Sequence, residues 1–317
     1  MYYLGVDGGG TKTKYLLIDK NLKKVSEVEG KTIHIHQVGV EGIKEELTKN
    51  LNKLCIEGNI KEKDIEYSFL GVPGYGESKD DMIEIDKVVR EVFKENYLVG
   101  NDAVNGWAAG TSCKPGINMV AGTGSIAYGR NKEGKIARSG GFGPGIGDDG
   151  SAYWIGLKTI NEYTKQKDGR KKKTILLNLI EEEYGIGYTY EIVDIVFNRL
   201  KFNRTEIAKF SKIAALAAEK GCEASIEIFK EAAKSIFEHI EVLARELDFK
   251  EEFILSYTGG VFKAGDLILN PLKDLINKSG LKCILQEPKL DPWYGSALLA
   301  YNLAGNVVPD DVVEILK

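Results

Sequence analysis

The stretch from Leu4 to Lys14, L-G-V-D-G-G-G-T-K-T-K, restricts the possible folds of this chain more than any other segment. An apolar run leads into Asp7, three glycines follow, and a second apolar run begins at Tyr15, which predicts two strands joined by a glycine turn. Without Cβ atoms, the glycines at positions 8 to 10 allow a positive φ and a close backbone approach, so their N–H groups can point at an anion. A plain glycine hairpin is the alternative, because a single glycine turn is a weak motif.

A phosphate is the anion that best suits this turn. Asp7 cannot favour a phosphate directly, but its carboxylate suits a Mg²⁺ ion, or the water shell of that ion, that bridges phosphate oxygens. We therefore expect a phosphate site at the turn with a metal at Asp7.

Composition excludes several classes of partner. The formal net charge of −4 gives no basic surface, so neither nucleic acid nor an anionic membrane surface is expected to bind. The four cysteines are scattered without a C-x-x-C spacing, which argues against a zinc site and a disulfide framework. The first strand begins near Tyr2 and no apolar run approaches about 18 residues, so we expect a cytoplasmic protein that does not span a membrane.

The sequence from Asn118 to Ile136 can be aligned with the sequence from Tyr3 to Val25. Both read as strand, glycine and threonine turn, strand, charged turn and strand, which is a weak internal repeat. The repeat predicts two related units, each offering a glycine turn, at residues 8–11 and 122–125, with a phosphate chain between the turns. A chance similarity of two hairpins is the alternative.

Strands alternate with helices along the rest of the chain, which indicates a sheet with a parallel portion. We expect further strands at 25–31, 67–72, 97–100, 253–257 and 282–285, and helices at 41–54, 80–94, 103–110, 226–247, 267–277 and 295–304.

A glycine-rich loop at Gly140–Trp154 precedes a helix that begins near Ser151, and only its contacts can shape such a loop. Asp148 and Asp149 stand at the start of this helix, where capping of free N–H groups is the alternative to a functional role for at least one of them. The basic run Lys165–Lys173 reads as a solvated loop, and we assign it no role.

Five motifs together resemble the N-acetylglucosamine kinase branch of the actin and sugar-kinase superfamily, close to bacterial N-acetylmuramate and N-acetylglucosamine kinases. The resemblance covers nearly the whole chain. The motifs are Asp7–Thr11, Asp102, A-G-T-G-S at Ala121–Ser125, G-D-D-G-S-A-Y-W at Gly147–Trp154 and T-G-G-V at Thr258–Val261.

The resemblance implies an α/β fold of two duplicated actin-like (ribonuclease H-like) domains, forming two lobes around a central cleft. The N-terminal lobe would span residues 1–115, with a C-terminal helix at 295–317 packing back on it. The second lobe would span residues 116–294 and carry a helical insertion. A homodimer is expected.

The resemblance also implies roles for individual residues, with ATP and Mg²⁺ as cofactors. The expected nucleotide-binding and phosphate-binding residues are Gly8, Gly9, Gly10, Thr11, Lys12, Gly122, Thr123, Gly124, Gly259 and Gly260, with Asp7 at the metal through water. The expected sugar-binding residues are His34, His36, Asp102, Gly141, Phe142, Gly143 and Asp148.

Two positions depart from the pattern of that family. Phe142 stands where the family usually has tryptophan, which keeps an aromatic face but loses an N–H donor. The loop containing His34 and His36 lacks the usual asparagine, so the contact with the N-acetyl or C3 side of the sugar is uncertain. If this segment is extended, both histidines point to the same face, where they could donate to the lactyl carboxylate of N-acetylmuramate. A packing loop with exposed histidines is the alternative.

The resulting hypothesis is an ATP-dependent kinase for the 6-hydroxyl of N-acetylglucosamine, N-acetylmuramate or both, in cell-wall sugar recycling. Asp102 directly follows a strand and precedes a small-residue helix, where its carboxylate can accept the proton of the hydroxyl. A simple N-cap is the alternative for Asp102. The rival functions are a glucosamine kinase, an ATPase activator of a hydroxyacyl-CoA dehydratase, and a non-catalytic sugar sensor.

Overall fold

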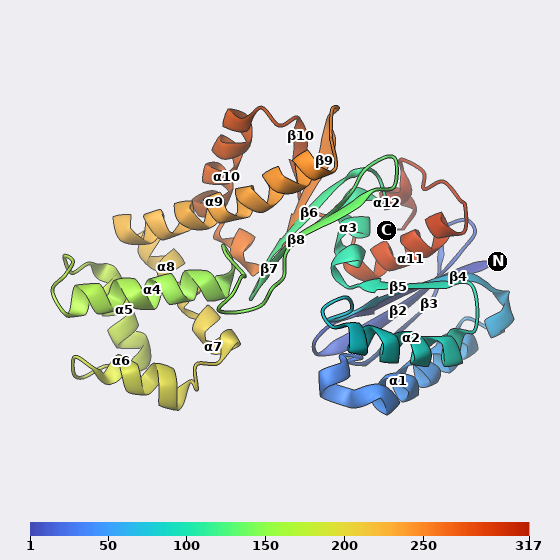
Figure 1. The fold of residues 1–317 in the computed structure, drawn as a ribbon, viewed down its shortest axis with the longest axis horizontal. Helices are drawn as coiled ribbons and strands as arrows, with labels where there is room; N and C mark the ends of the chain where they lie inside the picture. Colours follow the sequence, from blue (N-terminus) through green and yellow to red (C-terminus); the bar gives the residue numbers. More distant parts are fainter. Residues whose placement is uncertain (317) are drawn as a thin grey trace. The chain divides into compact units, whose positions relative to one another are not determined.

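A computed structural model describes residues 1–316 and contains two five-stranded sheets (Figure 1). The first, ordered β3-β2-β1-β4-β5, consists of β1 (Tyr2–Gly8), β2 (Lys12–Asp19), β3 (Lys24–Lys31), β4 (Ile65–Val72) and β5 (Tyr97–Asn101). The second, ordered β10-β9-β6-β7-β8, consists of β6 (Gly116–Ala121), β7 (Ser125–Arg130), β8 (Ile136–Gly140), β9 (Phe253–Thr258) and β10 (Cys283–Gln286). Each strand of the second sheet takes the place of the strand five earlier in the first. The predicted duplicated α/β fold is therefore confirmed.

The chain forms two compact units. Unit 1 comprises Met1–Asn118, Ile254–Ser256 and the segment from Leu285 onward, and unit 2 comprises Met119–Phe253 and Tyr257–Ile284. The helices of unit 1 are α1 (Ile35–Glu57), the short 3₁₀ helix η1 (Glu62–Asp64), α2 (Lys79–Phe93), α3 (Ala103–Thr111), α11 (Pro292–Leu303) and α12 (Val312–Ile315). Those of unit 2 are α4 (Ala152–Lys167), α5 (Ile175–Tyr184), α6 (Glu191–Asp194), the π-helical η2 (Ile195–Arg199), α7 (Arg204–Ala208), α8 (Phe210–Glu219), α9 (Glu223–Glu246), the 3₁₀ helix η3 (Gly260–Ala264) and α10 (Asp266–Ser279). No helix within residues 1–316 is both long and apolar enough to cross a membrane.

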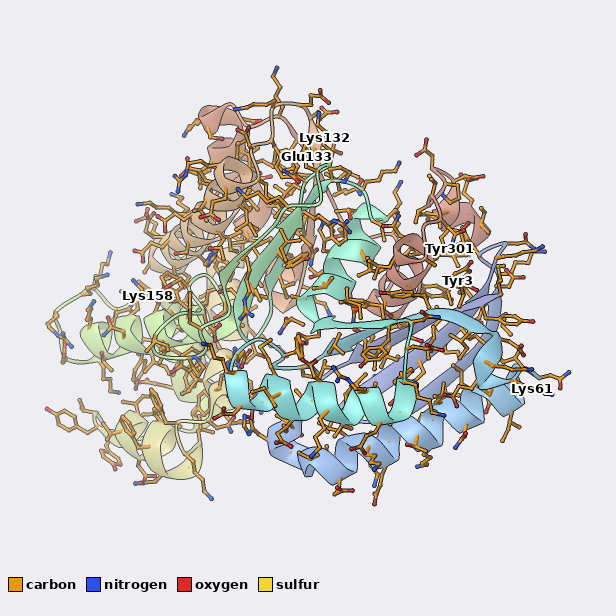
Figure 2. The ribbon with its side chains drawn as sticks, turned by 45° about the vertical axis from the view of Figure 1, so that its right-hand side comes forward. Tyr3, Lys61, Lys132, Glu133, Lys158 and Tyr301 are labelled. Atoms are coloured by element: carbon orange, nitrogen blue, oxygen red, sulfur yellow. The ribbon has the colours of Figure 1, made fainter. Side chains whose placement is uncertain are left out.

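Strand β1 is covered on both faces. Its side chains alternate, as those of any strand do. Leu4 and Val6 belong to the apolar core that includes the buried faces of α1 and α2. Tyr3 and Gly5 contact α11 instead. The rings of Tyr3 and Tyr301 meet edge to face, with 4.9 Å between their centroids (Figure 2), and Gly5 packs against the helix backbone. Asp7 shares the alternation of Tyr3 and Gly5, so its carboxylate lies on the α3 and α11 side of the sheet.

Helix α1 begins earlier than the sequence predicts. It starts at Ile35 and ends at Glu57, with a kink at Gly39, whose φ is +67°. His34 is its N-cap, and His34 Nδ1 accepts a hydrogen bond from the His36 amide at 3.3 Å. The condition that this segment is extended is therefore not met, although the rings of His34 and His36 still lie close together, with 5.8 Å between their centroids. Histidine is an uncommon cap, so the sequence carried no usual signal for the start of this helix.

Two interpretations of helix ends from the sequence are wrong. The cap of α4 is Ser151, whose hydroxyl accepts a hydrogen bond from the Trp154 amide, so neither Asp148 nor Asp149 has that role. The single helix predicted for 295–317 is two helices, α11 and α12, separated by residues 304–311; the last residue of the predicted helix, 317, lies outside the described chain.

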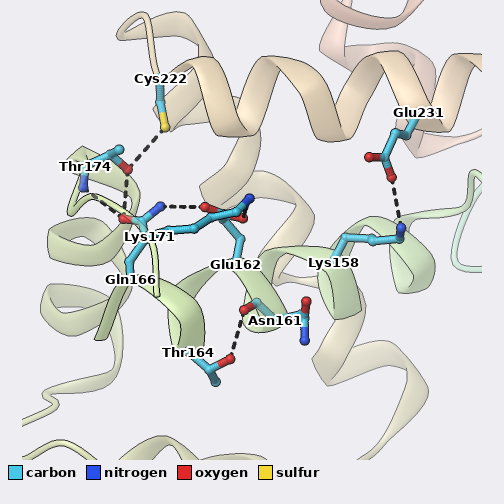
Figure 3. Close-up of polar contacts among 9 residues, drawn as sticks. All are labelled: Lys158, Asn161, Glu162, Thr164, Gln166, Lys171, Thr174, Cys222 and Glu231. Carbon is cyan, nitrogen blue, oxygen red and sulfur yellow. Dashed lines mark hydrogen bonds and ion pairs between the residues drawn. The ribbon is translucent and has the colours of Figure 1, made fainter. Parts of the chain in front are cut away.

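The basic run Lys165–Lys173 is not simply a solvated loop. Its first three residues complete α4, and Lys171 donates a hydrogen bond to Glu162 at 2.6 Å. From Glu162 a chain of polar contacts continues through Gln166 and Thr174 to Cys222 (Figure 3). Because Glu162 and Gln166 are buried, these contacts satisfy groups that would otherwise destabilise the helical part of unit 2. Lys167 also forms an ion pair with Glu181, and Arg170 forms one with Asp168.

The packing of β1 on α11 predicts a position that only glycine can occupy. A Cβ on Gly5 would collide with the backbone of Ser296 and Ala297 in α11. We expect Gly5→Ala to lower the free energy of unfolding by about 1–3 kcal/mol, the usual cost of overpacking. Gly10→Ala is the matched control, because no atom lies within 4 Å of its Cβ position, and it should change stability by less than about 0.5 kcal/mol. Urea denaturation of both variants measures this; equal stability of the two would contradict the packing argument.

Candidate active site

The first glycine turn leaves two neighbouring backbone amides without acceptors. The Gly9 amide donates to the Lys12 carbonyl at 2.8 Å, which closes the turn between β1 and β2. Within residues 1–316, the amides of Gly10 and Thr11 donate no hydrogen bond. The turn is held from the side by Thr32, whose hydroxyl donates to the Gly9 carbonyl at 2.7 Å. A fixed turn with free amides is suited to bind an anion.

Of the three glycines in this turn, Gly8 is required for space, and none of them is required for a positive φ. None of the three glycines at positions 8–10 has a positive φ, so that part of the sequence argument is wrong. A Cβ on Gly8 would lie 2.7 Å from Pro73 Cδ and 2.8 Å from the Gly71 carbonyl oxygen, so the close-approach argument holds at this position. The side chain of Lys12 is directed to Glu29, with 2.8 Å between Nζ and Oε2.

Asp7 is a partly buried carboxylate at the end of β1. Its Oδ1 accepts a hydrogen bond from Asn105 Nδ2 at 2.7 Å. Burial raises the pKa of the Asp7 carboxyl to about 6, with a further rise from the charge of Asp291, while the Asn105 hydrogen bond opposes the shift. Sequence reasoning missed Asn105 and Asp291. Asn105 lies one helical turn after Asp102 on α3, a spacing that places both on one side of the helix.

Asp102 occupies the N-cap position of α3 but does not cap it. Its side chain makes no capping hydrogen bond, and Asn101 Oδ1 accepts the Ala103 amide at 3.0 Å instead. The alternative that Asp102 is a simple N-cap is therefore not supported. Burial raises the pKa of the Asp102 carboxyl to about 6, and the negative charge of Asp7 raises it further. The fold of unit 1 thus brings two carboxylates together, each with a perturbed pKa, as is common at functional sites.

The two histidines have different surroundings in unit 1. His36 Nε2 lies 2.9 Å from Asp81 Oδ2, at the start of α2. His34 Nδ1 is used in capping α1, whereas its Nε2 has no hydrogen-bond partner within the described residues. The His34 amide also donates to Thr32 Oγ1, the group that holds the first glycine turn.

The second glycine turn, Gly122–Ser125 in unit 2, is built on the same plan. The carbonyls of Gly122 and Thr123 accept the amides of Ala152 and Tyr153, at 2.8 and 3.3 Å. Over residues 1–316 the amides of Thr123 and Gly124 have no acceptor. As in the first turn, the carbonyls are held and two neighbouring amides are available.

The glycine loop after β8 presents one predicted sugar-binding residue to solvent and buries another. Phe142 is 71% exposed and lies between Gly141 and Gly143, which both have a positive φ. Asp148 is 1% exposed; its Oδ1 accepts the Ser125 amide at 3.2 Å, and its Oδ2 lies 2.6 Å from Arg204 Nη2. Asp148 therefore supports the second glycine turn directly. The sequence gave no indication of Arg204, which is far from Asp148 along the chain.

The third glycine pair lies at the end of β9. Gly259 has a φ of +109°, and a Cβ there would collide with the Ala121 carbonyl, so only glycine fits. Gly260 begins η3, and nothing lies within 4 Å of its Cβ position. This turn is thus packed against the end of β6 that leads into the second glycine turn.

Comparison with known proteins agrees with these features. The sequence profile of the BadF/BadG/BcrA/BcrD ATPase family matches residues 4–300. This chain belongs to that family. Among relatives, it is 31% identical over 304 residues to the N-acetylmuramic acid/N-acetylglucosamine kinase of Clostridium acetobutylicum, covering 94% of this chain and 98% of the relative. It is also 31% identical over 313 residues to the N-acetyl-D-glucosamine kinase of Dictyostelium discoideum, covering 95% and 98%.

A solved structure supports the fold of this family member. A candidate N-acetylglucosamine kinase from Chromobacterium violaceum superimposes with a TM-score of 0.70 at 21% identity, covering 94% of this chain and 98% of the other. At this identity the likeness concerns the fold alone.

The raised pKa of Asp102 predicts a pH-dependent gain in stability when its charge is removed. The pKa of Asp102 in the folded state, about 6, exceeds the reference value of 3.8. The protonated carboxyl therefore contributes to the stability of the folded state below pH 3.8, and this contribution is lost as the pH rises through 6. Asp102→Asn cannot ionise, so it should be more stable than wild type at pH 8, by up to about 3 kcal/mol, and nearly equal to it at pH 4.

Denaturant titrations at the two pH values measure this difference. The control is Glu84→Gln, which removes an exposed carboxylate from α2 and should show no such pH dependence. A difference between Asp102→Asn and wild type that is the same at both pH values would rule out a strained, partly buried Asp102 carboxylate.

Proposed function

We propose that this protein is an ATP-dependent kinase that phosphorylates the 6-hydroxyl of N-acetylated amino sugars, N-acetylglucosamine, N-acetylmuramate or both. The observation that carries the proposal is the Asp102 carboxylate, which is partly buried, feels the charge of Asp7, has a pKa near 6 and is not used as a helix cap. The two kinase relatives, each 31% identical over nearly the whole chain, support the choice of substrate class. A role in recycling cell-wall sugars follows from that class.

Asp102 acts as the general base in this proposal. A carboxylate with a pKa near 6 is ionised at neutral pH, yet it is basic enough to accept a proton from a hydroxyl as the oxygen attacks phosphorus. Phosphoryl transfer passes through a loose transition state, so positioning and charge stabilisation supply most of the acceleration. The amides of the two glycine turns, Gly10–Thr11 and Thr123–Gly124, are the donors available to phosphate oxygens.

The residues around Asp7 fit a magnesium ion that is held mainly by water and phosphate. In residues 1–316 no three acidic, histidine or cysteine side chains are arranged to hold a metal by themselves. Asp7 is nevertheless a partly buried carboxylate whose pKa is raised by desolvation and by the charge of Asp291, and a nearby cation would relieve this cost. Mg²⁺ commonly binds through one or two carboxylates while keeping several waters. Asp7 would hold the ion, which would neutralise charge on the transferred phosphate.

Phe142 and the glycines beside it are the proposed sugar-binding groups of unit 2. Phe142 offers an exposed aromatic face, and the flanking glycines Gly141 and Gly143 allow the backbone to approach a ligand. Asp148, later in the same loop, supports the second glycine turn. His34 contributes an unpaired Nε2 from unit 1. The adenine is expected near Gly259 and Gly260.

The main rival is an ATPase that activates a hydroxyacyl-CoA dehydratase, which needs cysteines at a subunit interface for an iron–sulfur cluster. Cys55 and Cys222 are buried, and Cys222 Sγ donates to Thr174 Oγ1 at 3.3 Å within the helical part of unit 2. Two of the four cysteines are thus packed inside the protein, which favours the kinase. Assays with different sugars distinguish the proposed function from that of a glucosamine kinase and from that of a sugar sensor.

The proposed function is tested by ADP release with a panel of sugars. N-acetylglucosamine, N-acetylmuramate or both should support turnover, while glucosamine, N-acetylmannosamine and glucose support less. Asp102→Asn should lower kcat by about 10²–10⁴-fold, because the general base is lost, with a much smaller change in sugar affinity. Turnover of the variant within about threefold of wild type would refute the role of Asp102, and sugar-independent ATP hydrolysis would favour the activator function.

His34 is the better of the two histidines for recognising the lactyl group of N-acetylmuramate, because His36 is already paired with Asp81. His34→Ala should raise KM for N-acetylmuramate about tenfold, the loss of one charge-assisted hydrogen bond, and change KM for N-acetylglucosamine less. His36→Ala is the matched control and should leave the ratio of the two KM values within about twofold. Equal effects of His34→Ala on both sugars would indicate a shared N-acetyl contact instead.

A further inference from the structure

Arg204 lies directly against the second glycine turn in unit 2. Its Nη2 donates to Asp148 Oδ2 at 2.6 Å, and Asp148 Oδ1 in turn accepts the Ser125 amide at 3.2 Å. A Cβ built on Gly124 would collide with Arg204 Nη2 and would lie 2.8 and 2.9 Å from the two Asp148 oxygens. The absence of a side chain at Gly124 is therefore what allows the guanidinium and the carboxylate to reach the turn.

The guanidinium has donors that the chain does not satisfy. Arg204 Nε is buried and has no hydrogen-bond partner within residues 1–316. The side chain as a whole is 41% exposed, so the group is not sealed inside the unit. A buried donor without an acceptor is costly, and a cluster that tolerates one often has a ligand to bind. The helix that carries Arg204 is fixed by its own cap, because Asn203 Oδ1 accepts the amides of Thr205 and Glu206.

The surroundings of the guanidinium favour an anion. One of the two free amides of the turn belongs to Gly124, whose Cβ position Arg204 Nη2 occupies, and the other belongs to the preceding residue, Thr123. Asp148 accepts a hydrogen bond from only one guanidinium nitrogen, Nη2, so the other N–H groups of Arg204, including the buried Nε, are not used by this carboxylate. A carboxylate that holds an arginine in place, with the remaining N–H groups of its planar fork available, is well suited to binding phosphate oxygens.

We propose that Arg204 is a phosphate-contacting residue of the nucleotide site at Gly122–Ser125, and that buried Asp148 is the positioning residue that orients it. This inference rests on the proposed function in that it takes the anion to be the phosphate chain of ATP. It assigns Asp148 a nucleotide-side role in addition to the sugar-side role that the sequence resemblance implies.

Calorimetric titration of ATP, ADP and AMP, each without sugar, tests the proposal. Arg204→Gln should weaken ATP and ADP binding about tenfold and change AMP binding less than about threefold, because the lost contact is with the distal phosphates. Arg199→Gln is the matched control: Arg199 is a half-exposed arginine of unit 2 paired with Glu191 and Asp194, and its loss should leave all three affinities within about twofold.

Different results overturn the inference in different ways. Unchanged ATP affinity in folded Arg204→Gln would exclude a phosphate contact, and equal losses for ATP, ADP and AMP would mean that Arg204 only maintains the structure. If Arg204→Gln does not fold, Arg204→Lys keeps a cation beside Asp148 but loses the planar fork. It should weaken ATP at least about threefold with AMP unchanged, and unchanged ATP binding would again refute the contact. If wild-type protein binds ATP but phosphorylates no amino sugar, the proposed function is refuted. The role of Arg204 is still tested in that case, because the nucleotide titrations contain no sugar.

Discussion

The site depends on one constraint, namely that two short turns must keep neighbouring backbone amides unpaired while every group around them is held. Unpaired amides are costly in a folded protein unless solvent or a ligand satisfies them. In unit 1 the turn is closed by the Gly9 to Lys12 hydrogen bond and braced by Thr32. In unit 2 the carbonyls of Gly122 and Thr123 are held by the start of α4. The same solution thus occurs twice, once at each hairpin of the duplicated sheets.

The carboxylates of Asp7 and Asp102 are a cost to the stability of the folded protein. Asp7 and Asp102 are partly buried and interact electrostatically, and their raised pKa values mean that the folded chain holds their charges at a cost. Packing of β1 between two helical layers supplies the stability that tolerates this cost. A protein selected for stability alone would place neutral residues at both positions, so the carboxylates are best understood as functional.

Much of the fold and part of the site could be predicted from the sequence, because those features are encoded locally. The L-G-V-D-G-G-G-T motif specifies strand, turn and carboxylate within a few residues. The similar sequence that begins at Asn118 predicted the duplicated topology. Asn105 and Arg204 could not be found in this way, since they reach Asp7 and Asp148 only through tertiary packing. The start of α1 was missed because a histidine caps it.

The glycines illustrate the same limit. Sequence alone favoured glycine at positions 8–10 for its backbone freedom, whereas the structure uses Gly8 to make room for Pro73 and Gly71. Neighbours that are distant in sequence decide whether a glycine is needed for its backbone conformation or for the room that a missing side chain leaves. The sequence can therefore indicate that a glycine is important without indicating why.

Thr32 has a consequence beyond bracing a turn. Its hydroxyl donates to the Gly9 carbonyl and accepts the His34 amide, so one side chain joins the first glycine turn to the segment that carries the histidines. A change in the position of either part therefore acts on the other through Thr32. Any coupling of binding events through such a connection is reciprocal, with each ligand changing the affinity for the other by the same factor.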